Sequence, residues 1–530
     1  MDETVKAMTT EFEEYLRDES RVVGEAQSIS FPKSEEDVLE VVSLMRKSKN
    51  PITIQGARTG LAASAVPNGG HIMNMGKMNK ILGARFDEKE NKFYLRLQPG
   101  VLLSQLRKIL LNKNFETEGW SNESKSALAN FAPGQWFFSP DPTETSASIG
   151  GMISCNASGA RTFFYGPTRN YISSMRIVLA NGSVAELTRG GQKAKGKIFS
   201  LDTLDLHRII SNLPDYQMPN VKNASGYFVR EDMDLIDFFI GAEGSLGIIT
   251  EIEVILLPSP KAIWGITSFF PNEKTALRFV RALRGEKVEG ADIFNKKPVA
   301  IEFFNHYALD LLRKQKEEST AFAGIQELKD SYHTAVYTEF HGDSDQELWE
   351  VVAKLGTLIG QLGADENNTW VANNDRDMEK LLSFRHAVPE SVNMLIDQRR
   401  KSDPTLTKLG TDMAVPDAYL DKVMDMYNSD LALKGLEFVI FGHIGNNHVH
   451  VNILPRNAED YKTGKELYLQ WSRQVVDWGG TVSAEHGVGK LKRAFLLEMY
   501  KEYGIGQMRE LKRLFDPQGM INAGNMFTFN

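Results

Sequence analysis

The chain has 530 residues and a formal net charge of −8, with 42% hydrophobic and 25% charged residues, which is the composition of an ordinary soluble globular protein long enough for several domains. The negative charge gives no reason to expect nucleic acid as a partner, because binding a polyphosphate needs a basic surface. The lone cysteine, Cys155, excludes an intrachain disulfide and any iron–sulfur cluster held by four cysteines of this chain, so electrons, if handled here, need another carrier.

The N-terminal residues 1–20 mix acidic with apolar residues at helical spacing. No basic segment is followed by an apolar core, so this segment does not resemble a signal peptide. The sequence has no run of about 18 uninterrupted apolar residues, which predicts that no helix spans a membrane. We therefore expect a cytoplasmic protein, with peripheral contact to the inner face of a membrane left open. The basic stretch 189–197 could meet anionic lipid or a partner, although a solvated loop is favoured.

The first half, residues 1 to about 260, alternates helical patterns with short β-rich runs and glycine-bearing turns. Residues 34–49 predict an amphipathic helix that begins with a serine cap. Residues 51–54 predict a strand that leads into the turn 56–60, and the Asn181-Gly182 pair between two apolar runs predicts a β-hairpin. The first half is therefore expected to be an α+β domain with many tight turns.

The second half has a different pattern, which begins at about residue 262. Strand-like runs alternate with helical segments, and the order of these elements is 262–270, 273–283, 300–305, 307–316, 335–341 and 345–359. Such alternation predicts a second α/β or α+β layer with its own core. Residues 438–443 and 448–454 predict paired strands, and the tail from about 490 is predicted to be helical.

The segment GHIGNNHVHVN, residues 442–452, carries three histidines, and Glu485 and His486 follow it in a glycine-flanked turn. Histidines one strand period apart share a face of the strand, so side chains from this segment can converge. Imidazole and carboxylate groups bind divalent cations, and a catalytic site keeps an open coordination position. For any one histidine alone, packing is the simpler interpretation, but the Glu485-His486 turn favours a metal site and an enzyme.

Glu485 and His486 are predicted to have different roles, because neighbouring side chains on an extended segment diverge. We expect Glu485 to bind the metal and His486 to act as a base. Proton transfer from an alcohol with a pKa around 15 to an imidazole near 6.5 is uphill by about 12 kcal/mol. A bound cation can lower the pKa of water from about 15.7 to about 7, so metal and histidine together make alcohol deprotonation feasible at neutral pH.

Two glycine-rich segments could bind a diphosphate. Residues 56–61 follow a predicted strand, and SASIGG, residues 146–151, precedes NASG, residues 156–159. Consecutive backbone amides and small hydroxyl groups can form anion-binding nests, although each segment alone is as readily a structural turn. Neither has the Gly-x-Gly-x-x-Gly pattern, and Gly489-Lys490 lacks the rest of a nucleotide P-loop, which argues against NAD and ATP.

Six segments carry a family resemblance, and in chain order they are PITIQGARTGLAASAVP, SPDPTETSASIGGMISCNASGARTFFYGPTRNY, IGAEGSLGIITE, FGHIGNNHVHVNILP, GGTVSAEHGVGKLKR and FDPQGMINAGNMF. Together they resemble the FAD-linked oxidases of the vanillyl-alcohol oxidase and p-cresol methylhydroxylase type. The chain looks most like the branch that includes D-lactate, D-2-hydroxyglutarate and glycolate dehydrogenases. The resemblance runs from about residue 30 to 527, and it specifies the superfamily better than the substrate.

The resemblance implies an α+β fold, with a two-part FAD-binding domain of the p-cresol methylhydroxylase type and an α/β (ferredoxin-like) cap domain that carries the substrate site. The expected parts are an N-terminal helical extension at 1–24, the FAD-binding domain at 25–260, the substrate and cap domain with the metal site at 261–490, and a C-terminal segment at 491–530 that returns to the FAD domain.

By matching positions, the resemblance implies a set of FAD-binding residues around the diphosphate, adenosine and flavin groups. They are Gln55, Gly56, Ala57, Arg58, Thr59, Gly60, Pro140, Asp141, Thr145, Ser146, Ser148, Gly150, Gly151, Asn156, Ser158, Gly159, Glu243, Gly247, Ile248 and Asn522. No histidine occupies the first diphosphate turn, so noncovalent FAD is expected, and His71 remains the candidate for an attachment.

The resemblance also implies the chemistry-bearing residues. His443, His450 and Glu485 match the ligands of one divalent metal ion, which could be zinc, manganese, iron or cobalt, and His486 matches the catalytic base. The expected substrate-binding residues are Arg385, whose planar fork of donors suits a carboxylate, together with Asn452 and Lys408.

The chain departs from the family pattern at several positions. Asn446, Asn447 and His448 replace Asp-Gly-Asn, so His448 could be a third nitrogen ligand, although a supporting or packing role is favoured. Arg58 replaces a glycine and could reshape the diphosphate turn or add a charge contact. Pro389 and Gly410 replace a threonine and a lysine of hydroxyglutarate-specific members, which argues against recognition of a second carboxylate unless Lys408 compensates.

We therefore expect an FAD-dependent, metal-assisted dehydrogenase that oxidises a small D-2-hydroxy acid to the 2-oxo acid. Its electrons would pass to an external acceptor such as a quinone, a cytochrome, an electron-transfer flavoprotein or an iron–sulfur subunit. The alternatives are a nonredox flavoenzyme related to alkylglycerone-phosphate synthase and a noncatalytic electron-transfer subunit. The oligomeric state stays open, with a homodimer among the alternatives.

Overall fold

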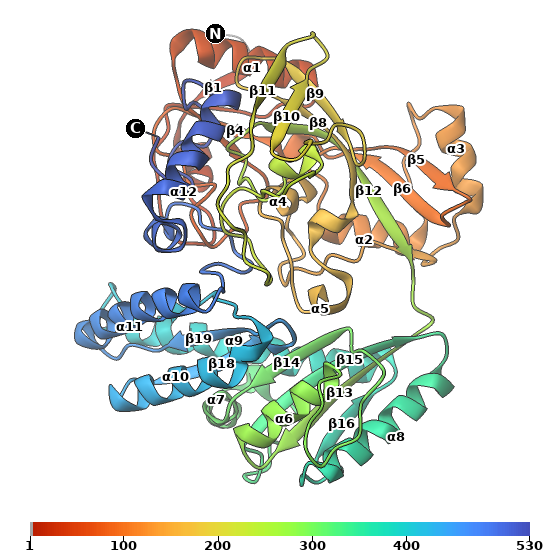
Figure 1. Ribbon diagram of the computed structural model, residues 1–530, viewed down its shortest axis with the longest axis vertical. Helices are drawn as coiled ribbons and strands as arrows, with labels where there is room; N and C mark the ends of the chain where they lie inside the picture. The colour runs from red at the N-terminus through yellow and green to blue at the C-terminus, as the bar shows by residue number, and fades with distance from the viewer. Residues whose placement is uncertain (1–3, 530) are drawn as a thin grey trace.

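The computed structural model describes residues 4–529, and the chain forms two parts that are joined by two crossings. The first part, in the upper half of Figure 1, holds the chain up to the end of β12 (Ile248–Pro258) and the C-terminal helix α12 (Arg493–Phe515). The second part, in the lower half, begins with β13 (Ala262–Phe270). Among the described residues, no helix is long and apolar enough to cross a membrane.

The first sheet has four strands in the order β1 (Val5–Ala7), β2 (Ser28–Ser30), β4 (His71–Asn74) and β3 (Ile52–Gln55). Strands β2, β4 and β3 run parallel, so β3 delivers the chain to the turn 56–60 at the edge of this sheet. Helix α1 (Glu35–Ser48) packs its apolar face on these strands, and the Ser34 hydroxyl caps it by accepting from the Asp37 amide, as predicted. The N-terminal segment, which was expected to be a helical extension, forms the strand β1 and a 3-10 helix, Thr10–Leu16.

The second sheet is antiparallel and has the strand order β5 (Ile81–Asp87), β6 (Lys92–Leu97), β12, β8 (Ile172–Val178) and β9 (Val184–Thr188), with β7 (Trp136–Phe137) paired to β12. The β8–β9 pair is the hairpin predicted at Asn181-Gly182. The short strands β10 (Ile198–Asp202) and β11 (Arg208–Asn212) form a separate ribbon. The helices of this region are α2 (Leu103–Asn112), α3 (Asn122–Ala127), α4 (Ile149–Ser154) and α5 (Thr162–Tyr165).

The second part is built on a seven-stranded antiparallel sheet. Its strand order is β16 (Thr369–Ala372), β13, β15 (Thr334–Gly342), β14 (Ala300–Phe304), β18 (Phe438–His443), β19 (His448–Ile453) and β17 (Leu409–Gly410). Its helices are α6 (Glu273–Leu283), α7 (His306–Glu318), α8 (Asp345–Gln361), α9 (Asp375–Arg400), α10 (Leu420–Leu433) and α11 (Ala458–Asp477). The predicted alternation of strands and helices is confirmed, and two apolar cores cover the two faces of the sheet.

The C-terminal segment returns to the first part. Helix α12 contributes Leu496, Met508 and Phe515 to the large core there, and Ile521 forms a parallel bridge with Ile52 of β3. In Figure 1, α12 (blue) is drawn in the upper half, together with the first part of the chain. The loop between α11 and α12 therefore passes from the second part to the first, and it carries Glu485 and His486 with it.

Candidate active site

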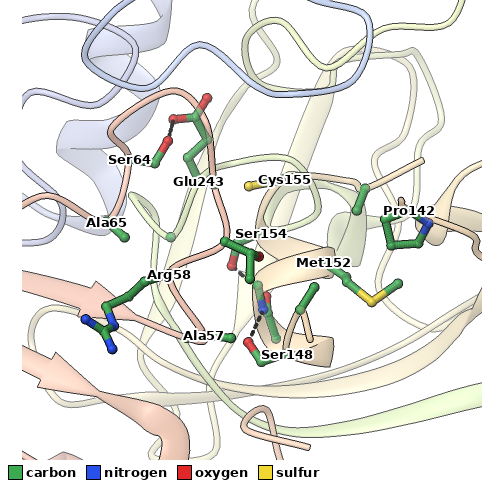
Figure 2. Close-up of a pocket in the computed structure, with 18 of the residues that line it drawn as sticks. Ala57, Arg58, Ser64, Ala65, Pro142, Ser148, Met152, Ser154, Cys155 and Glu243 are labelled. Carbon is green, nitrogen blue, oxygen red and sulfur yellow. Dashed lines mark hydrogen bonds between the residues drawn. The ribbon is translucent and has the colours of Figure 1, made fainter. Parts of the chain in front are cut away.

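A large cavity of about 1340 Å³, part of it open to solvent, lies in the first part beside the turn that follows β3 (Figure 2). Many of the expected FAD-binding residues line it, namely Gly56, Ala57, Arg58, Thr59, Gly60, Ser148, Gly150, Gly151, Ser158, Glu243, Gly247 and Asn522. Glu485 and His486 also line the cavity, so it reaches the loop that enters from the second part.

The other expected FAD-binding residues, which do not line the cavity, are Gln55, Pro140, Asp141, Thr145, Ser146, Asn156, Gly159 and Ile248. Several of them support the cavity wall. The buried Gln55 amide donates to the carbonyl groups of Tyr15 and Ala65, which holds the loop after β3. His71 is fully buried between Ser28 and Ser30 and does not line the cavity either.

The two glycine-rich segments approach each other too closely for larger residues. A Cβ on Gly56 would lie 2.2 Å from the Ser148 hydroxyl oxygen, and a Cβ on Gly150 would lie 2.5 Å from the Pro99 side chain. The Ser148 hydroxyl in turn accepts from the Gly151 amide at 3.3 Å. Small residues on two facing segments leave room for the close approach of an extended diphosphate, so the cavity suits the FAD expected there.

Arg58 has a left-handed backbone, with φ of 62°, where the resemblance places a glycine. Its guanidinium contacts the Glu14 carboxylate at 3.0 Å and lies 4.3 Å from the centre of the Tyr15 ring. Figure 2 shows this group directed away from Ser148 and Glu243. The arginine therefore keeps the glycine-like turn and ties it to the N-terminal segment.

Glu243 fastens the loop from the second part to the cavity. Its buried carboxylate accepts from the amides of Val488 at 2.6 Å and Gly489 at 2.9 Å. It also accepts from the Ser64 hydroxyl at 2.9 Å, a contact that Figure 2 shows. Burial raises the pKa of this carboxyl, while the two amides oppose the shift. The contact fixes the backbone immediately after His486, which holds that residue at the cavity wall.

Four side chains with metal-binding atoms converge at the end of this loop. They are His443 at the end of β18, His448 and His450 on β19, and Glu485, and one ligand atom from each lies within 4.8 Å of the others. Nε2 of His443 lies 3.0 Å from Glu485 Oε2. The structure thus brings together the three expected metal ligands and adds His448. Such a set of imidazoles and one carboxylate suits a divalent transition metal ion.

Buried acceptors orient two of the expected ligand imidazoles. His443 donates from Nδ1 to Glu302 Oε1 at 2.7 Å, and His450 donates from Nδ1 to the Thr411 carbonyl oxygen at 3.0 Å. Burial opposes charge on His443, but the Glu302 carboxylate outweighs it and raises the pKa to about 9. Burial lowers the pKa of His450 well below its usual value. A hydrogen bond at one ring nitrogen leaves the other nitrogen for a metal.

His486 lies between the cluster and the cavity. Its ring stacks on His450 with 5.5 Å between centroids, and its amide donates to Asp412 Oδ2 at 3.0 Å. The side chain is 31% exposed, so it is reachable from the cavity that it lines. Burial lowers the pKa of this imidazole, and the Asp412 carboxylate opposes the shift.

The expected substrate residues are only partly close together. Arg385 on α9 lies 3.4 Å from Glu302, which also holds His443, and its guanidinium packs over the Tyr337 ring. Asn452 is buried on β19 and pairs with Gly410 of β17. Lys408 instead donates to Asn393, eight residues along α9 from Arg385, which is about 12 Å on a helix. Burial lowers the pKa of the Lys408 ammonium.

Sequence reasoning missed four charged groups with buried or partly buried side chains around the cluster, namely Lys222, Glu302, Asp412 and Lys492. Lys222 contacts Glu485 Oε2 at 3.2 Å, and Asp412 accepts from His448 at 2.9 Å and from Lys492 at 2.7 Å. Glu302 had one signal, because it is the only charged residue in the apolar strand AIEFF. Lys492 lies in the segment GGTVSAEHGVGKLKR but was assigned no role, and Lys222 and Asp412 lie in segments without a recognisable pattern.

Comparison with known proteins matches both parts of the chain. Residues 260–526 match the family model for FAD linked oxidases, C-terminal domain, and residues 26–121 and 123–188 match the model for an FAD binding domain. The structure is also similar to that of p-cresol methylhydroxylase, with a TM-score of 0.66, 16% identity, and coverage of 100% of this chain and 95% of that one. This likeness confirms the predicted α+β fold with an FAD-binding part of that type.

Three curated relatives are similar over nearly the whole chain. A D-lactate dehydrogenase of Anaerostipes hadrus is 27% identical and covers 97% of this chain and 92% of its own length. A D-2-hydroxyglutarate dehydrogenase of Stutzerimonas stutzeri is 26% identical, with coverage of 94% and 90%. Glycolate oxidase subunit GlcD of Bacillus subtilis is 25% identical, with coverage of 94% and 88%.

Proposed function

The chain belongs to the FAD-linked oxidases, and from this premise we propose that it is a metal-assisted dehydrogenase that oxidises a small D-2-hydroxy acid, such as D-lactate, to the 2-oxo acid. Its FAD-linked oxidoreductase class follows from the family, whereas the substrate and the metal are part of the proposal. The named activities of the three relatives share one reaction class on 2-hydroxy acids, which supports this choice of substrate.

One observation carries the proposal, namely that two adjacent residues serve two neighbouring sites. Glu485 contributes to the His443, His448 and His450 cluster, while His486 next to it lines the large cavity. A substrate held between the cluster and the cavity would therefore have a metal ion on one side and a flavin on the other. Oxidation of an alcohol carbon needs both, because the hydroxyl must lose a proton while the carbon loses a hydride.

The chain's own residues have distinct tasks in this proposal. Arg385 binds the substrate carboxylate through its planar guanidinium, and Asn452 contributes a polar contact beside it. His486 takes the hydroxyl proton at its imidazole. His443, His450 and Glu485 would hold the metal ion, which would supply the charge that lowers the pKa of the hydroxyl. FAD, when bound, would supply the hydride acceptor, and an external carrier would remove the electrons.

Anaerobic mixing of the FAD-loaded protein with D- and L-hydroxy acids tests the proposal. We expect D-lactate or a close analogue to bleach the oxidised flavin absorbance and to yield the 2-oxo acid, while the L-isomer reacts far more slowly. Retention of the flavin colour with every hydroxy acid in the panel would overturn the proposed reaction.

A variant pair separates the base from the rest of the site. We expect His486→Ala to bind FAD but to lose its reduction by substrate, whereas His207→Ala, which changes an exposed histidine, should react like the wild type. Unchanged flavin reduction in His486→Ala would remove this residue from the mechanism.

A further inference from the structure

The three histidines of the cluster share one arrangement. Each uses one ring nitrogen for a hydrogen bond to an oxygen outside the cluster, and the acceptors are Glu302 for His443, Thr411 for His450 and Asp412 for His448. The other ring nitrogen lies 3.0 Å from Glu485 Oε2 in His443 and 3.7 Å from it in His448, and a ligand atom of His450 lies within 4.8 Å of these groups. This is the geometry in which proteins present histidine to a metal ion, because the outer acceptor fixes both the tautomer and the ring orientation.

His448 has the clearest signature of the three. Its side chain is fully buried, its Nε2 lies 2.9 Å from Asp412 Oδ1, and its Nδ1 is a buried nitrogen with no hydrogen-bond partner. That nitrogen lies 3.7 Å from Glu485 Oε2. A buried polar atom without a partner costs about 1–3 kcal/mol, so a fold that keeps one at a metal-binding cluster needs a reason.

We propose that His448 is itself a metal ligand through Nδ1, so that the centre has three imidazoles and one carboxylate. Asp412 supports it as Glu302 supports His443. The resemblance places an asparagine at this position, so the third imidazole distinguishes this chain from the family pattern. The inference rests on the proposed function only in taking the cluster as a metal site, and it does not depend on the substrate.

The third imidazole changes which ions can work at the centre. With four protein ligands, a tetrahedral ion such as Zn²⁺ has a filled coordination sphere, as in structural zinc sites. An ion that accepts five or six ligands, such as Mn²⁺, Fe²⁺ or Co²⁺, keeps positions for the substrate. Mg²⁺ and Ca²⁺ are disfavoured, because they prefer oxygen ligands. The centre therefore favours a six-coordinate transition metal ion, and Zn²⁺ should occupy it as an inhibitor.

The number of imidazoles on the metal is the direct test. The FAD-loaded protein is stripped with a chelator and loaded with CoCl₂, and the metal content is measured by elemental analysis. X-ray absorption fine structure then counts the histidines bound to cobalt. We expect one Co²⁺ with three imidazoles in the wild type and two in His448→Asn. A wild-type centre with two imidazoles would overturn the proposal, and this result needs no variant.

Affinity supplies a second measurement. We expect His448→Asn to bind Co²⁺ more than about 100-fold more weakly than the wild type, because loss of a supporting residue alone weakens metal binding by roughly 10–100-fold. The matched control is His71→Asn, which changes another fully buried histidine that has two hydrogen bonds outside the cluster. His71→Asn should leave the affinity for Co²⁺ unchanged. If His448→Asn also bound Co²⁺ as tightly as the wild type, the ligand role of His448 would be contradicted.

The outcomes separate this inference from the proposed function. Three imidazoles on cobalt without flavin reduction by any hydroxy acid would leave the metal centre in place and remove the dehydrogenase. Flavin reduction with only two imidazoles would keep the dehydrogenase and remove His448 as a ligand. Added ZnCl₂ should displace Co²⁺ from the loaded wild type and stop flavin reduction, and full activity with Zn²⁺ would contradict the coordination argument.

Discussion

Acidification should loosen the first sheet through one buried histidine. His71 of β4 is fully buried, and its two ring nitrogens each lie 2.8 Å from a serine hydroxyl, those of Ser28 and Ser30. Burial lowers the pKa of this imidazole from 6.5 to about 4. The folded state therefore binds fewer protons than the unfolded state between these values, and stability falls as the pH drops below about 6.5.

The size of the effect follows from the shift in pKa. At 1.36 kcal/mol per unit, the full penalty below pH 4 is about 3 kcal/mol, and the part lost between pH 7 and pH 5 is about 2 kcal/mol. The loss should appear as easier release of FAD, because β4 pairs with β3, and β3 leads into the turn 56–60 at the cavity.

The assay is chemical denaturation of the FAD-loaded protein at pH 7 and pH 5, followed by the rise in flavin fluorescence on release. In His71→Gln the difference in the free energy of unfolding between the two pH values should be smaller than in the wild type by about 2 kcal/mol. Other titrating groups cancel in this comparison, and His207→Gln, which changes an exposed histidine, should behave like the wild type. Equal pH dependence in His71→Gln and the wild type would refute the reasoning.

Three further changes test other contacts. Asp412→Asn should lower the free energy of unfolding by roughly 3–5 kcal/mol in urea titrations. The reason is that this buried carboxylate accepts hydrogen bonds from Lys492, Ser483, His448 and the His486 amide. The control Asp343→Asn, at an exposed position, should change the free energy of unfolding by no more than about 0.5 kcal/mol. Gly489→Ala should destabilise the protein by roughly 2 kcal/mol or more, because its φ is +52° and the new Cβ would lie 1.9 Å from the Ala62 carbonyl oxygen. The control Gly506→Ala, where a Cβ would meet open space on α12, should raise the free energy of unfolding by about 0.5–1 kcal/mol. Arg385→Lys should raise KM for the hydroxy acid by roughly 10-fold or more with a smaller loss in kcat, since one ammonium replaces a planar fork, and an unchanged KM would place the carboxylate elsewhere.

Local patterns predicted most helices and strands of the second part. The run Ala262–Phe270 and the helix Glu273–Leu283 have the predicted bounds, because apolar periodicity and a cap are properties of neighbouring residues. The sheet order was not predictable in this way. Strand β13 pairs with β15, and β14 lies between β15 and β18, so the pairing depends on contacts between distant segments.

The same limit applies to the candidate site. His443, His450 and Glu485 could be named from motifs, but Glu302 lies 141 residues before the histidine that it orients. Lys408 was expected to bind substrate because it lies near Gly410 in the chain. In the structure its ammonium donates to Asn393 on α9. Charge pairing inside a core leaves little trace in the sequence, because the partner of a buried charged group can come from any part of the chain.

The Glu485-His486 pair has a consequence for how this scaffold can diversify. One peptide bond sets the spacing between the cluster and the cavity wall, and the amides of Val488 and Gly489 anchor it to Glu243. An insertion at this junction would shift the metal-binding cluster and the cavity wall at once. Helix α9 and the short strand β17 border the cluster but do not contain that junction. Substitutions on these two elements can therefore change substrate selectivity without moving the cluster relative to the cavity.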